Sequence, residues 1–346
     1  MRKTKGKFIM TTFSSNISRI RQCVEAAIKF NRKIIFMGRG YTQALIEKYA
    51  DIDEFLDWEK IKNLSLTEQV EVMKRLNADI IIHVVPDKNL ARIAKSAKIK
   101  HRIGTSRRLF NWFSCNHLVK VSRKNSSLHE TQMDMQYLKA FGLKHNFSLK
   151  EIINLRRFKP FTHTETIDAL IDPKKFNLIL HPKTRGQHIE WPEEHFANLI
   201  ESLSSEEYKI FLTGSAEEGK KFYSNLVKPF PHVIDLTGKT SLEEMLELIS
   251  RADGLIAAST GPIHLAANFG IKTLGLYAPI KPFDAGRWGP VGKEAQVLSI
   301  KKNCSDCRTS PPCFCIASIT PEQVSSIVQT WQNQHVRQQE FSHDRA

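Results

Sequence analysis

The sequence of 346 residues has no apolar stretch near the ~20 residues that a bilayer-spanning helix needs, which excludes a helical membrane protein. Residues 1–5 lack the apolar core of a signal peptide, so we expect a cytoplasmic protein. Acidic residues are also fewer than basic ones. The sequence has 36 Asp and Glu against 51 Lys and Arg, which gives a formal net charge of +15. This imbalance predicts an anionic partner such as nucleic acid, an anionic membrane face or a phosphorylated glycolipid.

Many of the basic residues gather in one region of the N-terminal half. No recognisable nucleic-acid-binding module accompanies them, so we do not expect a nucleic-acid partner. Two interpretations stay open, a solvated basic face and a surface for lipid phosphates and acidic sugars. The cluster comprises Lys95, Lys98, Lys100, His101, Arg102, Arg107, Arg108, Lys120, Arg123 and Lys124.

Cysteine is scarce, and four of the six lie together as Cys304, Cys307, Cys313 and Cys315. A disulfide framework is not expected in a protein that stays in the cytoplasm. The spacing is able to hold a tetrahedral zinc ion, but its central loop is much shorter than in common zinc ribbons. We therefore expect no metal and keep zinc as the alternative.

The C-terminal half is a run of strand–helix units with short connections. Such alternation predicts a parallel sheet covered on both faces. Ser241 and Glu244 form a capping box before the third helix, and Gly270 is suited to end the fourth. Strands are expected over residues 176–181, 209–213, 232–236, 254–258 and 272–277, and helices over 192–203, 216–227, 242–251 and 262–269.

The N-terminal half repeats this pattern less regularly. Strands are expected over residues 7–12, 33–37, 79–85 and 101–104, helices over 17–30, 42–49, 66–76 and 88–97, then a return strand over 124–129 and a helix over 138–143. A polar, Pro-containing stretch, 156–173, links the halves. The sequence therefore predicts an α/β protein with Rossmann-like domains over 1–160 and 174–331, followed by a disordered tail over 335–346.

The most informative motif spans residues 254–267. An apolar run typical of a buried strand meets the small polar turn Ser259-Thr260-Gly261, and a helix then begins with Pro262. Free backbone N–H groups and the positive end of the helix dipole favour a phosphate there, within reach of His264. Taken alone, the motif is equally compatible with an ordinary strand-to-helix turn.

Further motifs flank this turn in the sequence. Upstream lie His181-Pro182-Lys183-Thr184-Arg185-Gly186 and Glu190-Trp191-Pro192-Glu193-Glu194-His195-Phe196, and downstream lies the stretch 277–290, which contains Gly-Arg-Trp-Gly-Pro. In this order and spacing, the motifs closely resemble glycosyltransferase family 9, the ADP-heptose:lipopolysaccharide heptosyltransferases. The resemblance covers about residues 38–331. It implies the GT-B fold, in which two Rossmann-like domains with parallel sheets face a cleft.

The resemblance implies an ADP-sugar donor and neither a cofactor nor a metal ion. The family uses the loop after the first C-terminal strand to contact donor phosphates, and the later strand ends complete the nucleotide site, where ligands of open α/β sheets bind. Each residue also has a structural interpretation, such as solvation or a favourable charge at a helix dipole. The expected donor-binding residues are Lys183, Thr184, Arg185, Gly214, Glu217, Glu218, Thr240, Ser259, Thr260, Gly261 and His264.

The sequence departs from the family pattern at three places. Ser259 stands where many members carry Asp, and Ile189 stands where they carry Lys, a cation that Arg185 and His188 are candidates to replace. The family normally opens with a strand ending in Gly-Asp, whose Asp is taken as the general base. Here Asn16 occupies the approximate position, and a neutral amide cannot act as a base as a carboxylate does. The catalytic residue therefore stays unassigned.

Residues 6–40 instead resemble a β-CASP segment of ribonuclease J, through the pattern T-x-F-x-S-N-x-x-R and later Arg-Lys and Gly-Arg pairs. That nuclease also needs a His-x-His-x-Asp-His metal site, which this sequence lacks, so nuclease activity is not expected. The segment is either an acquired replacement that still folds as βαβ or a coincidence of small turn motifs.

The resemblance to family 9 implies transfer of a heptose-like sugar from an ADP-sugar to a lipopolysaccharide core acceptor, with inversion at the anomeric carbon. It also implies a location at the cytoplasmic face of the inner membrane, in peripheral contact with its anionic surface. Arg102, Arg107 and Arg108 are the expected acceptor-binding residues. The missing Asp predicts slow transfer. Two alternatives stay open: a catalytically inactive protein that binds sugar nucleotide or glycolipid, and a GT-B sugar-nucleotide epimerase.

Overall fold

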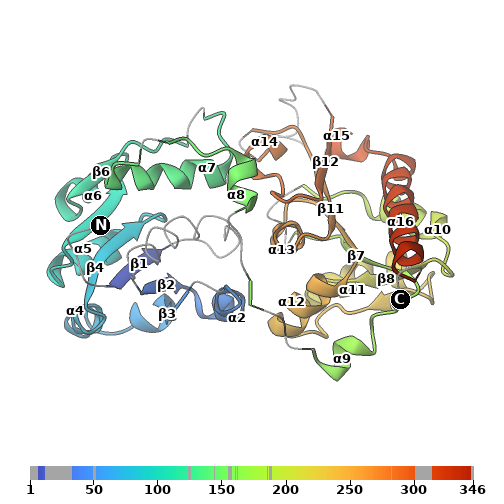
Figure 1. The fold of residues 1–346 in the computed structure, drawn as a ribbon, viewed down its shortest axis with the longest axis horizontal. Coiled ribbons are helices and arrows are strands. Elements are labelled where there is room, and N and C mark those ends of the chain that lie inside the picture. The colour runs from blue at the N-terminus through green and yellow to red at the C-terminus, as the bar shows by residue number, and fades with distance from the viewer. Residues whose placement is uncertain are drawn as a thin grey trace. The chain divides into compact units, whose positions relative to one another are not determined.

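The computed structural model divides into two compact units, Met1–Pro160 and Phe161–Ala346 (Figure 1). Each unit holds one six-stranded parallel sheet. The structure describes residues 7–11, 33–49, 52–123, 126–143, 145–154, 158–159, 161, 163–184, 186, 189–281, 283–300 and 314–343. Within these ranges, every helix is too short or too polar to cross a bilayer.

The first unit is built around a sheet with strand order β3-β2-β1-β4-β5-β6, in which neighbouring strands all pair in parallel. The order reverses between β1 and β4, as in doubly wound nucleotide-binding sheets. Its elements are β1 (Lys7–Thr11), β2 (Ile34–Gly38), α2 (Gln43–Glu47), β3 (Glu54–Asp57), α3 (Trp58–Ile61), α4 (Leu66–Arg75), β4 (Ala78–His83), α5 (Lys88–Ser96), β5 (His101–Thr105), α6 (Leu109–Ser114), β6 (His117–Val119), α7 (Glu130–Met135) and α8 (Leu149–Asn154), with 3-10 turns at Gly40–Thr42 and Gln136–Phe141.

The central strands of this sheet are apolar because helices cover them. Ile81 of β4 is fully buried against α4 and α5, in a cluster that includes Ile93. Helix α4 begins with a complete capping box between Ser65 and Glu68. Asp87 is the N-cap residue of helix α5, and its side chain accepts a hydrogen bond from the Leu90 N–H at 2.8 Å. Such caps fix where each helix starts and hence where its apolar face lies.

The second unit repeats the same topology with the strand order β12-β11-β10-β7-β8-β9. Counted from its own first strand, this is again the 3-2-1-4-5-6 order of a Rossmann-like sheet. Its elements are α9 (Glu165–Asp168), β7 (Phe176–His181), α10 (Glu193–Ser202), β8 (Tyr208–Leu212), α11 (Ala216–Phe222), β9 (Ile234–Asp235), α12 (Leu242–Arg251), β10 (Gly254–Ala257), α13 (Gly261–Phe269), β11 (Lys272–Tyr277), α14 (Ala285–Trp288), β12 (Ala295–Ser299), α15 (Phe314–Ala317) and α16 (Pro321–His343), with a π-turn at Tyr223–Val227.

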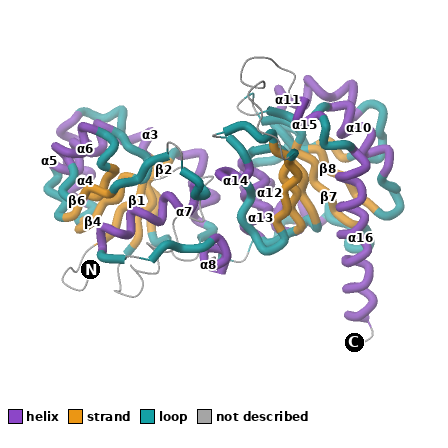
Figure 2. The backbone as a smooth tube through the Cα atoms, turned by 90° about the horizontal axis from the view of Figure 1, so that it is seen from above, coloured by secondary structure: helices purple, strands orange, loops and turns teal. Residues whose placement is uncertain are grey.

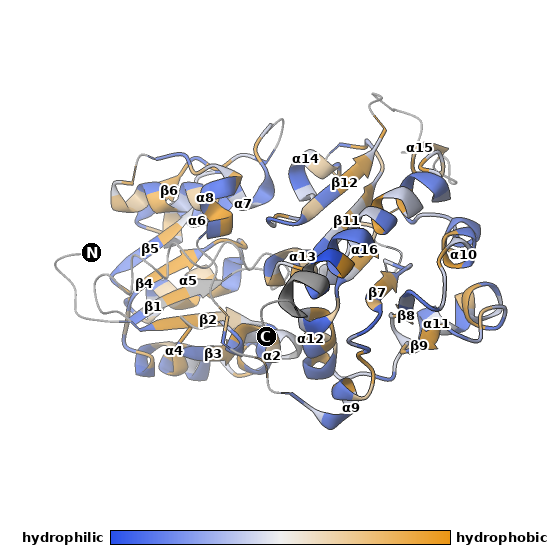
Figure 3. Ribbon diagram, turned by 45° about the vertical axis from the view of Figure 1, so that its right-hand side comes forward, coloured by the Kyte–Doolittle hydropathy of each residue, from blue (hydrophilic) through white to orange (hydrophobic). Residues whose placement is uncertain are grey.

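Helices α10 and α16 cover one face of the second sheet, and α12 and α13 cover the other (Figure 2). Trp191, which precedes α10, and Trp331 of α16 are each 1% exposed and belong to the same core cluster. The indole N–H of Trp191 donates to the Ile319 carbonyl at 2.8 Å, so its polar atom is paired as well. The hydropathy colouring shows the same division, with hydrophobic strands inside and mixed helices outside (Figure 3).

Several predicted elements of the second unit are confirmed at the expected bounds. They include β7, β11 and α12, and the capping box is present, with the Ser241 N–H 2.7 Å from Glu244 Oε2. Gly270 caps α13 in the left-handed conformation, with φ of 86°. These signals were reliable because each is a local property of a few neighbouring residues.

Other elements differ from the expectation. The return strand over 124–129 is wrong: β6 lies earlier, and His129 caps α7, which the sequence analysis missed together with β3 and β12. Edge strands of three to five residues such as β6 and β12 are too short to display a clear alternation. The helix expected over 17–30 falls outside the described residues.

The tail also differs from the expected disorder, because α16 continues to His343. Polar contacts hold this extension. The imidazole Nδ1 of His335 lies 3.2 Å from an Asp253 carboxylate oxygen, and the Gln339 amide donates to the Pro173 carbonyl at 2.8 Å. A polar composition was misleading here, because the part of α16 up to Trp331 is buried in the core and polar contacts of His335 and Gln339 hold the part that follows.

Candidate donor-nucleotide site

The carboxyl ends of β7 and β10 form the topological switch point of the second sheet. The two strands are neighbours, with Ala257 opposite His181 in their register. Chain connections diverge at this point, since β7 leads towards β8 and β10 leads towards β11. Open α/β sheets bind ligands at such points. The two loops expected to hold donor phosphates, 183–185 and 259–261, therefore begin on adjacent strands.

Helix α13 begins at this switch point with the features of an anion site. Thr260 is its N-cap residue, makes no side-chain capping bond, and is followed by a proline in the first turn. The first N–H groups of a helix have no acceptor within the helix, and its dipole adds partial positive charge. A Cβ added at Gly261 would meet none of the described atoms within 4 Å, so the space before the first turn is open. His264 lies half-buried in the same turn.

The two hydroxyls of this turn have different environments. The Thr260 hydroxyl is buried and has no hydrogen-bond partner among the described residues. Ser259 is buried too, but it hydrogen-bonds the phenol of Tyr277, whose hydroxyl donates to the Trp288 carbonyl at 2.8 Å. Burial raises the pKa of the Tyr277 phenol above its ordinary range, and the Ser259 bond opposes that rise. Ser259 is therefore paired within the protein, whereas the buried Thr260 hydroxyl has a donor and an acceptor that no described residue uses.

Replacing Thr260 by valine should change stability and binding in opposite directions. An unpaired buried hydroxyl costs about 1–3 kcal/mol, so Thr260→Val should keep or raise the melting temperature of the free protein. If the hydroxyl contacts a diphosphate, the same change should weaken ADP binding by about 1 kcal/mol, roughly fivefold. Thermal unfolding and calorimetry with ADP measure the two effects. Unchanged ADP affinity in Thr260→Val would remove the hydroxyl from the site.

Lys183 is held by carboxylates in this structure. Its ammonium pairs with Glu193 and lies 3.3 Å from Glu190, with the Lys183 side chain 16% exposed. Partial burial opposes the charge, but the two carboxylates outweigh it and raise the pKa of Lys183. The backbone N–H of Thr184 also donates to Glu190, at 2.8 Å. Glu190 thus contacts both Lys183 and Thr184, and the two carboxylates near the Lys183 ammonium compete with any phosphate it binds.

The residues predicted around β8 divide into two groups. Glu218 is buried and completes a capping box with Ser215 at the start of α11, and its contact with the donor stays a prediction. Glu217 in the same turn is exposed, and Thr240 is half-buried just before α12. Gly214 accepts a backbone hydrogen bond from Gly238 at 3.0 Å, which brings the loops after β8 and β9 together.

Several predicted residues lie outside the described residues: Asn16, Arg185, His188, Cys304, Cys307 and Cys313. Of the cysteine cluster, Cys315 is described, and its side chain is buried in the core of the second unit. Within the described ranges, no group of three or more His, Cys, Asp and Glu side chains is arranged to hold a metal ion. Ile189, which replaces the family's Lys, packs against the hydrophobic core.

Among the expected acceptor-binding residues, Arg102 makes contacts within the fold. Its guanidinium donates to the backbone carbonyls of Ile99 and of Ser114, the latter at 2.7 Å, and so ties β5 to the end of α6. Two of its five N–H donors are thus used within the fold, and the binding of the acceptor by Arg102 stays a prediction. Arg107 and Arg108 are exposed in the turn between β5 and α6.

Removing the Arg102 guanidinium should therefore lower stability, whatever its effect on acceptor binding. Hydrogen bonds to charged groups contribute about 1.5–3 kcal/mol, and Arg102→Leu should lower the free energy of unfolding by about that amount. Arg107→Leu is the matched control, since exposed substitutions usually change stability by less than about 0.5 kcal/mol. Denaturant unfolding compares the two variants. Equal stability of both would show that the Arg102 contacts contribute nothing.

The family model of glycosyltransferase family 9 (heptosyltransferase) matches residues 69–314, well over half of the chain. The chain belongs to glycosyltransferase family 9. A Haemophilus influenzae protein assigned as a glycosyltransferase is 26% identical over 277 residues, 75% of this chain and 77% of that protein. Lipopolysaccharide heptosyltransferase 1 of Escherichia coli O18:K1:H7 is 29% identical over 132 residues, only 38% of this chain and 39% of that enzyme.

Solved structures of the family share the fold. The E. coli ADP-heptose heptosyltransferase II superposes with a TM-score of 0.73 at 17% identity, covering 95% of this chain and 99% of that one. A Veillonella parvula family 9 protein gives a TM-score of 0.74 at 18% identity, over 96% and 99% of the two chains. These similarities, together with the two parallel sheets, confirm the α/β GT-B fold expected from the sequence.

The resemblance of the N-terminal segment to ribonuclease J is confirmed as well. The family model of the ribonuclease J beta-CASP domain matches residues 5–104, a range that includes β1 to β4 and nearly all of β5. Ribonuclease J of Helicobacter pylori J99 is 37% identical over 81 residues, which is 23% of this chain but 11% of the nuclease. The match is thus limited to part of one Rossmann-like unit.

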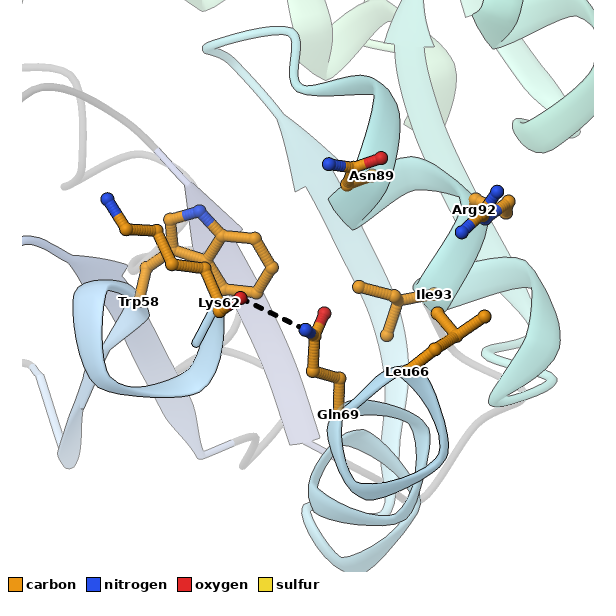
Figure 4. A pocket seen from close by; sticks show the side chains of 7 residues that line it. All are labelled: Trp58, Lys62, Leu66, Gln69, Asn89, Arg92 and Ile93. Atoms are coloured by element: carbon orange, nitrogen blue, oxygen red, sulfur yellow. Dashed lines mark hydrogen bonds between the residues drawn. The ribbon is translucent and has the colours of Figure 1, made fainter. Parts of the chain in front are cut away.

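A small pocket in the first unit is a poor candidate for a substrate site. It lies between α3, α4 and α5, has a volume of about 140 Å³, and is lined by Trp58, Lys62, Leu66, Gln69, Asn89, Arg92 and Ile93 (Figure 4). Ligand pockets are usually about 300–1,000 Å³. The Gln69 amide already donates to the Lys62 carbonyl across it, at 3.2 Å.

His83 is a residue that the sequence analysis did not select. It ends β4 beside β1, at the switch point of the first sheet, opposite Thr11. It is fully buried, and its ring nitrogens have no hydrogen-bond partner among the described residues. Burial and then the charge of Arg102 lower the pKa of His83 to about 4, so its imidazole is neutral near pH 7. The sequence did contain a signal for it, because His83 directly follows three isoleucines of a buried strand.

Proposed function

We propose that this family 9 protein transfers a heptose-like sugar from an ADP-sugar to a lipopolysaccharide core acceptor. The observation that carries the proposal is the start of α13 at the switch point. There, no described residue pairs with the N-cap hydroxyl of Thr260, and no described atom occupies the space next to Gly261. A diphosphate supplies the negative charge and the oxygen acceptors that this arrangement lacks.

The reaction needs few groups from the protein. An acceptor hydroxyl oxygen forms a bond to the anomeric carbon while the bond from that carbon to the diphosphate oxygen breaks, which inverts the configuration. The released ADP carries the developing charge, and the α13 N-terminus with nearby basic side chains stabilises it without a metal ion. The proton of the acceptor hydroxyl passes to a base that has no assigned residue.

The acceptor side is proposed to lie on the first unit. Arg107 and Arg108 are exposed there, within a strongly basic part of the sequence, and suit an acceptor that bears phosphates and acidic sugars. Because the lipopolysaccharide core is carried by a lipid, we place the protein at the cytoplasmic face of the inner membrane, in peripheral contact with its anionic surface.

The alternative function is a catalytically inactive protein that binds sugar nucleotide or glycolipid. The absence of a Gly-Asp pair near residues 8–19 favours it, since that pair carries the carboxylate taken as the family's base.

Incubation with ADP-heptose and purified core lipid separates the two functions. Transfer predicts ADP release that depends on the acceptor, together with a core product heavier by one heptose. Tight ADP binding in calorimetry without any product would support the inactive binding protein. Absence of both ADP binding and product would contradict the proposed donor site itself.

A further inference from the structure

Helix α6 of the first unit presents three of its four apolar side chains to solvent and its polar ones to the core. Leu109, Trp112 and Phe113 are 75%, 60% and 68% exposed. In contrast, Asn111 and Ser114 are buried, at 0% and 8%. A helix on the surface of a globular protein normally has the opposite arrangement, so the exposed side of α6 has the composition of a contact surface.

Hydrogen bonds fix this helix in its orientation. The Asn111 amide donates to the Thr105 carbonyl at 2.8 Å, and the Trp112 indole N–H donates to the Ser106 carbonyl at 2.9 Å. At the other end, the Lys95 ammonium donates to the Phe113 carbonyl at 2.8 Å. Glycine at position 104 allows the close approach, because a Cβ there would lie 2.8 Å from the Asn111 amide nitrogen. The three apolar side chains therefore protrude from a rigid base.

The surroundings of the helix are basic throughout. Residues 88–129 contain eleven Lys and Arg and no Asp or Glu. Arg107 and Arg108 immediately precede α6, and Lys95 and Lys98 lie on or just after the neighbouring α5; all four are exposed. Helices α5 and α6 lie side by side at the β6 end of the sheet (Figure 1).

We propose that this surface, defined by Leu109, Trp112 and Phe113 with the basic residues around them, docks the protein on an anionic lipid bilayer. Trp and Phe side chains partition into the interface between headgroups and acyl chains, and Lys and Arg bind the anionic headgroups. The proposal deepens the proposed function and rests on it for its purpose, since an acceptor carried by a lipid is met at a bilayer.

A second copy of the chain fits this surface less well. Two such surfaces would bring their basic rims together, which repels. Stable protein interfaces also need about 20–30 residues a side, and a six-residue helix offers three apolar side chains. An anionic bilayer complements both the charge and the small apolar area.

Sedimentation of the full chain with vesicles tests the proposal. We expect binding to vesicles of phosphatidylcholine with 30% phosphatidylglycerol and little binding to phosphatidylcholine alone. Leu109→Ser/Phe113→Ser should lose binding at least tenfold at every salt concentration, whereas Arg107→Gln/Arg108→Gln should flatten its salt dependence. Leu66→Ser is the matched control, because Leu66 is 48% exposed in the same unit but lies on α4.

Tryptophan emission gives an independent readout. Vesicles should shift the emission of the wild type to the blue, and Trp112→Phe should abolish that shift while keeping most of the binding. Wild-type binding by Leu109→Ser/Phe113→Ser, with unchanged melting temperature, would overturn the proposal. The proposal would also be overturned if the wild type did not bind vesicles and instead formed a dimer that Leu109→Ser/Phe113→Ser disrupts. The vesicles hold neither donor nor acceptor, so this experiment is independent of the transfer assay. A protein that binds these vesicles but transfers no sugar in the transfer assay would contradict only the proposed function.

Discussion

Replacing Gly261 by valine should weaken ADP binding at least tenfold, about 1.4 kcal/mol. The valine side chain would occupy the open space in front of α13 and prevent a diphosphate from approaching the first N–H groups. The fold should survive, because a Cβ at this position meets none of the described atoms within 4 Å. Calorimetry with ADP measures the loss.

A smaller side chain at the same position supplies the matched control. Gly261→Ala adds one methyl group and should lose less affinity than Gly261→Val, while both should keep the melting temperature of the wild type or raise it, since glycine is unfavourable inside a helix. An ADP affinity unchanged in a folded Gly261→Val protein would remove the α13 N-terminus from the donor site. Loss of affinity together with loss of folding would be a structural defect instead.

The second sheet was predictable because its signals are local. An apolar run, a capping box and a left-handed glycine each depend on a few neighbouring residues, and β7, α12 and the end of α13 follow them. No single segment predicts the order of the strands in the sheet. That order places the loops after β7 and β10 beside each other.

Side-chain roles were harder to predict because they depend on distant partners. Lys183 is separated from its carboxylate partner Glu193 by ten positions, and Arg102 donates two hydrogen bonds, to the carbonyls at positions 99 and 114. A basic residue in the sequence carries no sign of whether its charge is already used. The same limit applies to α6, whose inverted faces become evident only when burial is known.

Sugar transfer by the wild type should be slow compared with family members that carry the N-terminal Asp. A positioned general base typically contributes ~10²–10⁴-fold to such a reaction, and no carboxylate stands at the usual position. Asn16→Asp should therefore raise kcat without changing ADP affinity. Because Asn16 only approximates the position, Ser14→Asp and Ser15→Asp are tested with it.

The pH dependence distinguishes a restored base from an indirect effect. A carboxylate base acts when ionised, so the gained activity should fall as pH drops through the pKa of the new Asp and remain above it. Asn63→Asp is the matched control, since it adds the same charge at an exposed position after α3 and should leave kcat unchanged. The hypothesis of an impaired base would be contradicted if the wild type turned over as fast as ordinary family members and none of the three substitutions changed its kcat. The proton would then pass to a carboxylate elsewhere in the chain, because the chemistry of the acceptor hydroxyl still requires an acceptor for it.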